Sequence, residues 1–285
     1  MKGFRLTRVK RFHRVASGFL LVVFAGCGPR SGGPAEPGHD RMTQISVVSA
    51  LMVGRYDGVA TIPDLLREGD FGIGTLDHLD GELIILDGIA YQVRADGVIA
   101  KAGAGRSTPF ATVVRFRPDG VIPCPAVASL AELDDRLNSA IPRKNSFVAI
   151  RIKSTLASIT LRSVKRQEPP YRPLAEVAKS QSVWTHANLS GTLLGTRCPT
   201  WAGGLNVPGF HWHFLSDDHS IGGHVLDCRV SEGRVEFDVC REWLVRLEDS
   251  RGFDQADLGQ DLSRELRKVE SSRGDGQEGK PDSLK

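Results

Sequence analysis

Short apolar segments separated by Gly, Asp and Pro follow one another from about Ile45 onward, and this pattern constrains the fold more than any other feature of the sequence. Brief segments bounded by turn-forming residues are typical of β-strands. The step Asp96-Gly97 is well suited to a tight hairpin between two of them. The segments that fit strands are 47–56, 81–87, 91–95, 98–101, 111–116, 147–152, 158–164, 191–194, 209–215, 224–230 and 234–239. We therefore expect a domain dominated by strands.

Helical patterns are fewer. Residues 62–68 and 174–179 fit short helices. A longer helix is predicted to begin at Ser129, whose hydroxyl can cap the first turn while Glu132 completes a capping box. Near the C-terminus, apolar residues recur at helical spacing: Leu258, Leu262, Leu266 and Val269. This spacing predicts a final amphipathic helix that ends near Glu270.

The chain divides into four expected parts. Residues 1–27 fit an export signal, and the Gly-, Pro- and Ser-rich stretch 28–43 fits a flexible linker. Residues 44–270 are expected to form the folded domain, and the charged, polar stretch 271–285 a disordered tail. The domain is expected to have a mixed α+β fold, rich in strands, with two packed β-containing subdomains that meet near residue 145, a metal site between them and a C-terminal helix.

The export signal consists of a basic segment followed by the apolar run 19–26, which is too short to span a bilayer because a helix needs about 20 residues. Small residues directly before Cys27 resemble a bacterial lipobox, in which the cysteine carries lipid and becomes the new N-terminus. We expect an exported protein that is anchored to a membrane through Cys27. In the alternative, cleavage occurs nearby, Cys27 is removed or kept as an ordinary thiol, and the protein is periplasmic or secreted.

The basic character of the chain belongs to this signal. The chain has 37 basic and 34 acidic residues, and six of the basic ones lie before Cys27, where no acidic residue occurs. Without that segment the acidic residues are in slight excess. Nothing in the remaining sequence indicates a nucleic-acid partner.

Four cysteines follow Cys27, namely Cys124, Cys198, Cys228 and Cys240. An even number in an exported chain permits two disulfides, with three possible sets of pairings that the sequence does not distinguish. The spacings contain no CxxC pair, which argues against a structural zinc site made of cysteines.

The segment 209–227 contains the residues best able to hold a metal. Side chains alternate along a strand, so His211 and His213 are expected on one face. If the turn-rich stretch 216–223 reverses the chain, His224 joins them. Three neutral imidazoles around an open position suit a catalytic divalent metal, although His-x-His also occurs in purely structural strands. Two further histidines are expected to be loop residues rather than ligands: His78 and His219.

This segment resembles the metal-binding hairpin of the alpha-acetolactate decarboxylases, in which Gly-aromatic-His-x-His-Phe-Leu-Ser-x-Asp is followed by Gly-Gly-His-Val-Leu-Asp. The stretch 72–83 resembles the family's strand with an active-site glutamate, and 147–152 with 162–167 resemble its arginine-bearing region. The resemblance extends from about residue 45 to residue 270. It implies that zinc or a similar divalent metal is bound by three histidines: His211, His213 and His224.

The resemblance also implies roles for other residues. Loss of carbon dioxide from 2-acetolactate leaves an enediolate, whose negative charge a divalent metal stabilises as a Lewis acid. Arg162 is implied to position the departing carboxylate through its planar guanidinium. Glu82 and Glu270 match the family's two active-site carboxylates, one of which protonates the enediolate. Thr75 is implied as a substrate contact.

The predicted activity is conversion of (S)-2-acetolactate to (R)-acetoin and carbon dioxide by a metal-dependent carbon–carbon lyase, a step of acetoin and butanediol formation. Its partners would be a small-molecule substrate, a membrane reached through Cys27 and, in a homodimer, a second copy of the chain. Two alternatives remain open: an exported metal-binding lipoprotein of the same fold, and a three-histidine metalloenzyme that acts on another substrate.

Overall fold

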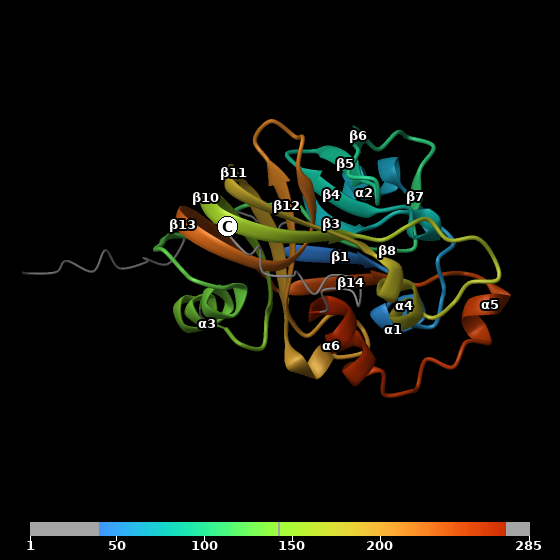
Figure 1. The fold of residues 1–285 in the computed structure, drawn as a ribbon. Coiled ribbons are helices and arrows are strands. Elements are labelled where there is room, and N and C mark those ends of the chain that lie inside the picture. The colour runs from blue at the N-terminus through green and yellow to red at the C-terminus, as the bar shows by residue number, and fades with distance from the viewer. Residues whose placement is uncertain (1–39, 142, 272–285) are drawn as a thin grey trace, which may run out of the picture. The chain divides into compact units, whose positions relative to one another are not determined.

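Two facing β-sheets form the framework of the fold (Figure 1). The computed structural model describes residues 40–141 and 143–271. The first sheet contains β1 (Arg41–Ile45), β3 (Phe71–Thr75), β4 (Glu82–Leu86), β5 (Ile89–Val93), β6 (Ile99–Lys101), β8 (Phe110–Val114) and β14 (Glu242–Arg246). The second contains β9 (Gly120–Cys124), β10 (Phe147–Ser163), β11 (Ser182–Cys198), β12 (Gly209–Ser216) and β13 (Gly222–Cys240). A separate ribbon consists of β2 (Ala60–Thr61) and β7 (Ser107–Thr108).

The strands follow one another in the order β14-β1-β8-β3-β4-β5-β6 in the first sheet and β10-β11-β12-β13-β9 in the second. Four strands of the second sheet close into a ring of pairings, because β10 pairs with both β11 and β13 and β12 joins these two. Apolar side chains from both sheets fill the layer between them, among them Ile73, Ile84, Ala149 and Leu194. This layer holds the two sheets in fixed positions, so residues from both can form one site.

The helices lie outside the sheets. They are α1 (Val48–Met52), α2 (Ile62–Glu68), α3 (Leu130–Ala140), α4 (Leu174–Val177), α5 (Arg251–Asp254) and α6 (Ser263–Ser271), with 3-10 turns η1 (Asp77–Leu79), η2 (Ala178–Ser180) and η3 (Thr200–Ala202). Helix α2 packs on the first sheet and α3 on the second, whereas α1, α4 and α6 pack on one another. The predicted cap of α3 is present, since Ser129 Oγ accepts a hydrogen bond from the backbone N–H of Glu132 at 3.2 Å. The predicted capping box is not formed, because the carboxylate of Glu132 accepts instead from the backbone N–H of Ala128 at 2.8 Å.

The predicted mixed α+β fold, rich in strands and ending in a helix, is confirmed. The two sheets are its two β-containing halves. Two strands cross the expected boundary near residue 145, because β9 joins the second sheet and β14 joins the first. Strand β14 pairs in parallel with β1 and thereby ties the end of the domain to its beginning.

Two expectations about local structure were wrong. Residues 47–56 fit a strand, but Val48–Met52 form α1, and all five of its residues are buried. A short apolar run does not distinguish a buried helix from a buried strand, and packing against α4 decides the outcome here. Strand β1 begins at Arg41, so residues 41–43 of the expected linker belong to a sheet.

Two long strands replace four predicted short ones. Strand β10 spans both 147–152 and 158–164, with the latter ending one residue earlier than predicted, and β13 spans both 224–230 and 234–239. In β10 the residues between the predicted pieces alternate between exposed and buried positions, so one face stays in the core. The polar residues between the predicted pieces therefore belong to the strands and do not end them.

The four described cysteines after Cys27 carry free, buried thiols, so the two disulfides that the sequence permits are not formed. Cys240 on β13 lies opposite Phe147 on β10, and Cys198 belongs to β11 on the other side of β10. Strands on either side of a third are about 9.6 Å apart, whereas a disulfide needs Cα atoms within about 7 Å.

The contact between β11 and β12 depends on a glycine. Gly195 lies opposite Trp212, and a Cβ at Gly195 would be 2.2 Å from Cε3 of the indole. We expect Gly195→Ala to reduce the free energy of unfolding by about 1–3 kcal/mol, because the indole must leave its place in a filled core. Chemical denaturation measures this, and Gly103→Ala, with open space around the added methyl group, is the control. Equal stability of both variants would contradict the conclusion that Gly195 makes room for the indole of Trp212.

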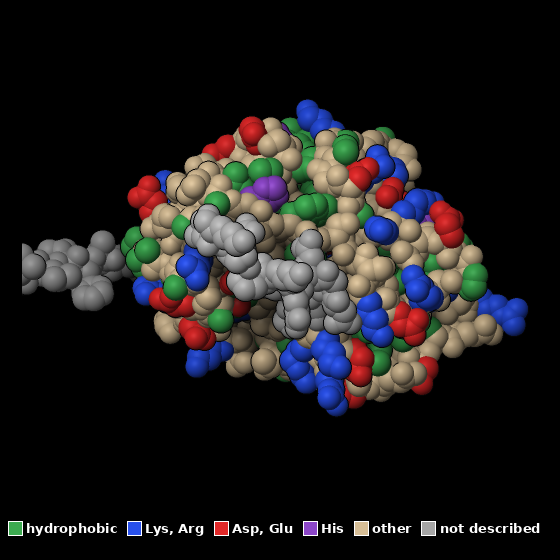
Figure 2. Space-filling view, viewed as in Figure 1, with side chains coloured by type: hydrophobic (Ala, Val, Ile, Leu, Met, Phe, Trp, Pro, Cys, Tyr) green, Lys and Arg blue, Asp and Glu red, His purple; other side chains and the backbone are tan. Residues whose placement is uncertain are grey.

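Helix α6 has two distinct faces. Leu266 and Val269 are buried with the side chains of α4, whereas Arg264, Arg267 and Lys268 are exposed. Lys and Arg side chains gather in Figure 2 where α6 lies in Figure 1. The predicted amphipathic helix at the C-terminal end is thus present, but it begins at Ser263, so Leu258 and Leu262 precede it. It covers one end of the region described below.

The expected export signal, the linker up to residue 39 and the tail from residue 272 lie outside the described residues. Within the described ranges, no helix combines the length and the apolar character that crossing a membrane requires.

Candidate metal centre

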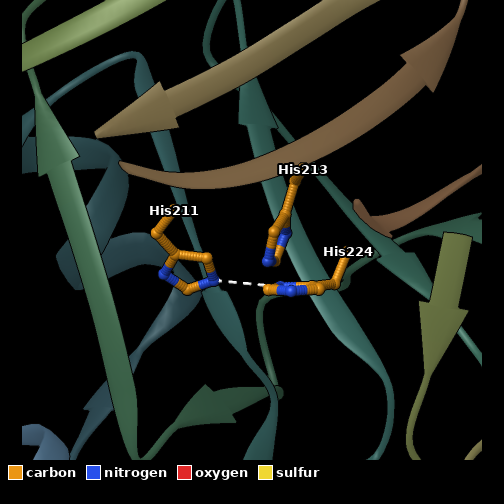
Figure 3. A group of neighbouring side chains, drawn as sticks. All are labelled: His211, His213 and His224. Atoms are coloured by element: carbon orange, nitrogen blue, oxygen red, sulfur yellow. Dashed lines mark hydrogen bonds between the residues drawn. The ribbon is translucent and has the colours of Figure 1, made fainter. Parts of the chain in front are cut away.

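The hairpin of β12 and β13 brings three histidines together (Figure 3). His211 and His213 are two residues apart on β12, and His213 lies directly opposite His224 on β13. Gly223 adopts a φ of +143°, and a Cβ there would be 2.6 Å from the carbonyl oxygen of Arg162. Only a glycine therefore fits at position 223, where β13 comes close to β10 directly before His224.

The turn of this hairpin is held by Asp218. Its carboxylate accepts hydrogen bonds from the Ser216 hydroxyl at 2.6 Å and from the backbone N–H of Ser220 at 3.0 Å. These hydrogen bonds lower the pKa of Asp218 to about 2, and the hydrogen bond from the Ser216 hydroxyl has the largest effect. The folded state thus binds a proton on this group less readily than the unfolded chain, in which the pKa is near 4.

We expect Asp218→Asn to lower the melting temperature, and to do so most above about pH 4, because the ionised carboxylate stabilises the turn there. As the pH falls from about 4 through 2, the wild type loses this stabilisation and the difference between the two proteins should shrink. Thermal melts across this range measure it, with Asp217→Asn as the neighbouring control. A difference that does not depend on pH would contradict the role of the charge.

The ring nitrogens of the three histidines fit a set of metal ligands. One nitrogen of each lies within 4.8 Å of the others, and His211 Nε2 is 3.1 Å from His224 Nδ1. Two nitrogens that share a tetrahedral zinc ion lie roughly 3.3 Å apart. His213 Nδ1 is hydrogen-bonded to the carbonyl oxygen of Leu83 at 3.1 Å, which directs its Nε2 toward the other two rings. This buried Nε2 has no hydrogen-bond partner among the described residues, so its lone pair is available to a cation.

Burial keeps these imidazoles neutral. It lowers the pKa of His211 and brings the pKa values of His213 and His224 well below 6.5, and the nearby guanidinium of Arg162 acts in the same direction. A neutral imidazole is the form that binds a metal ion.

Arg162 lies between two carboxylates beside the histidines. It is opposite His224 in the pairing of β10 with β13, and its side chain is almost fully buried. Its Nη1 is 3.4 Å from Glu82 Oε1, and its Nη2 is 3.7 Å from Glu270 Oε1. A buried guanidinium needs anionic partners, so these two carboxylates hold its charge in place.

The two carboxylates reach the histidines from different elements. Glu82 begins β4 in the first sheet, and its Oε2 is 3.7 Å from His213 Nε2. Glu270 lies on α6, and its Oε2 is 3.6 Å from His224 Nε2 and 3.8 Å from His211 Nε2. Burial raises the pKa of Glu82 to about 7. A carboxyl group with this pKa exchanges its proton near neutral pH.

Thr75 lies opposite Glu82 in the pairing of β3 with β4. Its hydroxyl donates a hydrogen bond to the carbonyl oxygen of Gly81 at 2.8 Å, which ties down the loop before Glu82. Thr75 also lines a cavity of about 40 Å³ together with Arg162, His211 and Glu270. All seven site residues named from the sequence are thus brought into one region.

The sequence did not indicate the apolar wall of this cavity. The wall includes Leu51, Leu79, Phe110, Leu174, Val207 and Leu266. These residues come from separate segments without a common spacing, so only the tertiary structure identifies them.

The two other histidines named from the sequence lie outside the group of three within the described part of the chain, as predicted. His78 Nδ1 is hydrogen-bonded to the hydroxyl of Tyr171. The ring of His219 packs against Tyr91, with 4.9 Å between the ring centroids.

Comparison with known proteins identifies the family of the chain. A family model described as alpha-acetolactate decarboxylase matches residues 42–260. The chain is 43% identical over 231 residues to an alpha-acetolactate decarboxylase of Methanosarcina mazei, covering 81% of this chain and 80% of the relative. It is 42% identical over 229 residues to that of Raoultella terrigena, covering 80% and 88%.

The fold is shared as well. The crystal structure of alpha-acetolactate decarboxylase from Bacillus subtilis strain 168 is similar with a TM-score of 0.79 and 33% sequence identity, over 81% of this chain and 100% of that one. The match therefore covers the whole of the solved relative and includes both sheets of this chain. The chain belongs to the alpha-acetolactate decarboxylase family and is a decarboxylase, that is, a carbon–carbon lyase.

Proposed function

We propose that the protein converts (S)-2-acetolactate to (R)-acetoin and carbon dioxide, with zinc or a similar divalent metal bound by His211, His213 and His224. One observation carries the proposal: three neutral, buried imidazoles converge beside a buried arginine and two carboxyl groups. This is the set of groups that decarboxylation of a hydroxy-keto acid requires.

Each residue has a defined task in this reaction. When bound, the metal supplies a Lewis acid that stabilises negative charge as it develops on the substrate's oxygen atoms. Arg162 binds the carboxylate that will leave, and its pairing with Glu82 and Glu270 keeps the guanidinium plane fixed. One of the two glutamates then delivers a proton to one face of the substrate carbon, which makes the product chiral.

Acetoin formation from racemic 2-acetolactate tests the proposal. We expect the purified protein to produce (R)-acetoin rapidly, to lose this activity after removal of metal by a chelator, and to regain it when zinc is restored. Carbon dioxide release from a series of related hydroxy-keto acids tests the choice of substrate. Zinc binding at one equivalent without acetoin above the spontaneous rate would overturn the assignment of substrate and leave the metal site intact.

We also propose that the chain is exported and attached to a membrane by lipid on Cys27, because an apolar run and small residues precede this cysteine. Fractionation of cells that produce the full chain, beside Cys27→Ser, tests this. Recovery of both forms in the same soluble fraction would contradict it.

A further inference from the structure

The face of β12 that points away from the histidines carries an unusually well-fixed side chain. Trp212 lies between His211 and His213 in sequence, and only 2% of it is exposed. Its indole stacks on Phe210 with the ring planes 11° apart, and it occupies the space left by the missing side chain of Gly195. The position of this indole thus helps to fix the backbone of β12 that carries His211 and His213.

One hydrogen bond restricts movement of the indole within the plane of its ring. Trp212 Nε1 donates a hydrogen bond to Asp134 Oδ1 on α3 at 2.9 Å. The same helix contacts the other strand of the hairpin, because the backbone N–H of Leu130 donates to Asp227 Oδ1 on β13 at 3.0 Å. Helix α3 therefore holds both strands that carry histidines, and it does so from the opposite side of the sheet.

We propose that Asp134 is a positioning residue for the metal centre: it holds Trp212, and through it the His-x-His segment of β12, in the geometry that binds a divalent metal. The proposal rests on the proposed metal site. It goes beyond that site because the hydrogen-bond partner of Asp134 is Trp212, which is not one of the proposed ligands.

A carboxyl group at this place is not explained by packing alone. Asp134 follows Leu133, which is part of the apolar core between α3 and the second sheet. Burial raises the pKa of Asp134 to about 7, so its charged form is destabilised there. An apolar residue at this half-buried position would avoid that cost, but it could not accept the indole N–H. The hydrogen bond to Trp212 is thus the function that the carboxyl group serves.

Zinc affinity, measured by competition with a chromogenic chelator, tests the proposal apart from activity. We expect Asp134→Ala to bind zinc about tenfold more weakly, because the hydrogen bond that holds Trp212 is lost. Asp134→Asn should stay within about threefold of the wild type, since its amide oxygen accepts the same bond. Trp212→Phe should lose as much as Asp134→Ala, and the double variant Asp134→Ala with Trp212→Phe should lose no more than either alone.

A matched control separates positioning from simple stability. Leu137→Ala truncates a buried side chain on the same helix and should lower the melting temperature while zinc affinity stays within about threefold of the wild type. The proposal is overturned if Asp134→Ala binds zinc as the wild type does, if the two single losses add in the double variant, or if Leu137→Ala weakens zinc equally. Failure of the wild type to bind zinc would instead overturn the proposed function.

Discussion

Replacement of His213 by Ala is expected to reduce zinc affinity at least about a hundredfold and to bring acetoin formation down to the spontaneous rate. His213 is completely buried, and its Nδ1 is held by the carbonyl oxygen of Leu83, so its Nε2 is directed toward the other two imidazoles. Without it only two ligands remain, and a divalent metal held by two imidazoles is lost to competing chelators. Equilibrium dialysis and acetoin assays on the same preparation measure both effects.

His219→Ala is the matched control for this experiment, because it removes an imidazole from the same hairpin but outside the group of three. It should leave zinc affinity and activity close to those of the wild type. A His213→Ala protein that remains folded and keeps both properties would refute the metal site. Circular dichroism of the two variants establishes that they are folded.

Replacement of Arg162 by Met is expected to lower kcat/KM by roughly two to three orders of magnitude, the range found when one preorganised charged or polar contact to the reacting group is removed. The guanidinium of Arg162 lies between Glu82 and Glu270, and it is the group suited to holding a carboxylate by two parallel hydrogen bonds. Arg162→Lys keeps the positive charge but lacks the paired N–H donors of the guanidinium. Compared with Arg162→Met, it should therefore restore stability more than activity.

The same substitution should also destabilise the fold. Met at position 162 leaves Glu82 and Glu270 without their shared cation, and breaking a buried ion pair in this way costs about 3–5 kcal/mol. Arg151→Lys is the control, because Arg151 lies on the same strand and pairs with Glu236 away from the site. Unchanged kcat/KM in a folded Arg162→Met protein would remove Arg162 from the reaction.

The local parts of the site were predictable because they depend on short stretches of chain. The alternation of a strand places His211 and His213 on one face, and a turn of Ser, Asp and Gly returns His224 to their side. The cap at Ser129 was likewise predictable from the sequence, since capping involves residues only three positions apart. The places of Glu82, Arg162 and Glu270 came from the resemblance to the family and from no spacing in the sequence.

Other features could not be predicted because they depend on what lies next to a segment. The apolar run at Val48–Met52 is a helix here because it packs with α4 and α6, and the same residues would fit a buried strand. The even number of cysteines permitted disulfides, but the strand order keeps Cys198 and Cys240 on opposite sides of β10. The thiols of these two cysteines are therefore free.

By itself the sequence determined the strand-rich class of the fold, the terminal amphipathic helix and the group of three histidines, because each follows from the periodicity of neighbouring residues. Only the tertiary structure decided that Glu82 from the first sheet and Glu270 from α6 meet at Arg162, and that Asp134 supports the histidines from behind through Trp212. These contacts join residues between 78 and 108 positions apart. Such contacts arise when buried surfaces pack against one another, and no local pattern in the chain encodes which surfaces will meet.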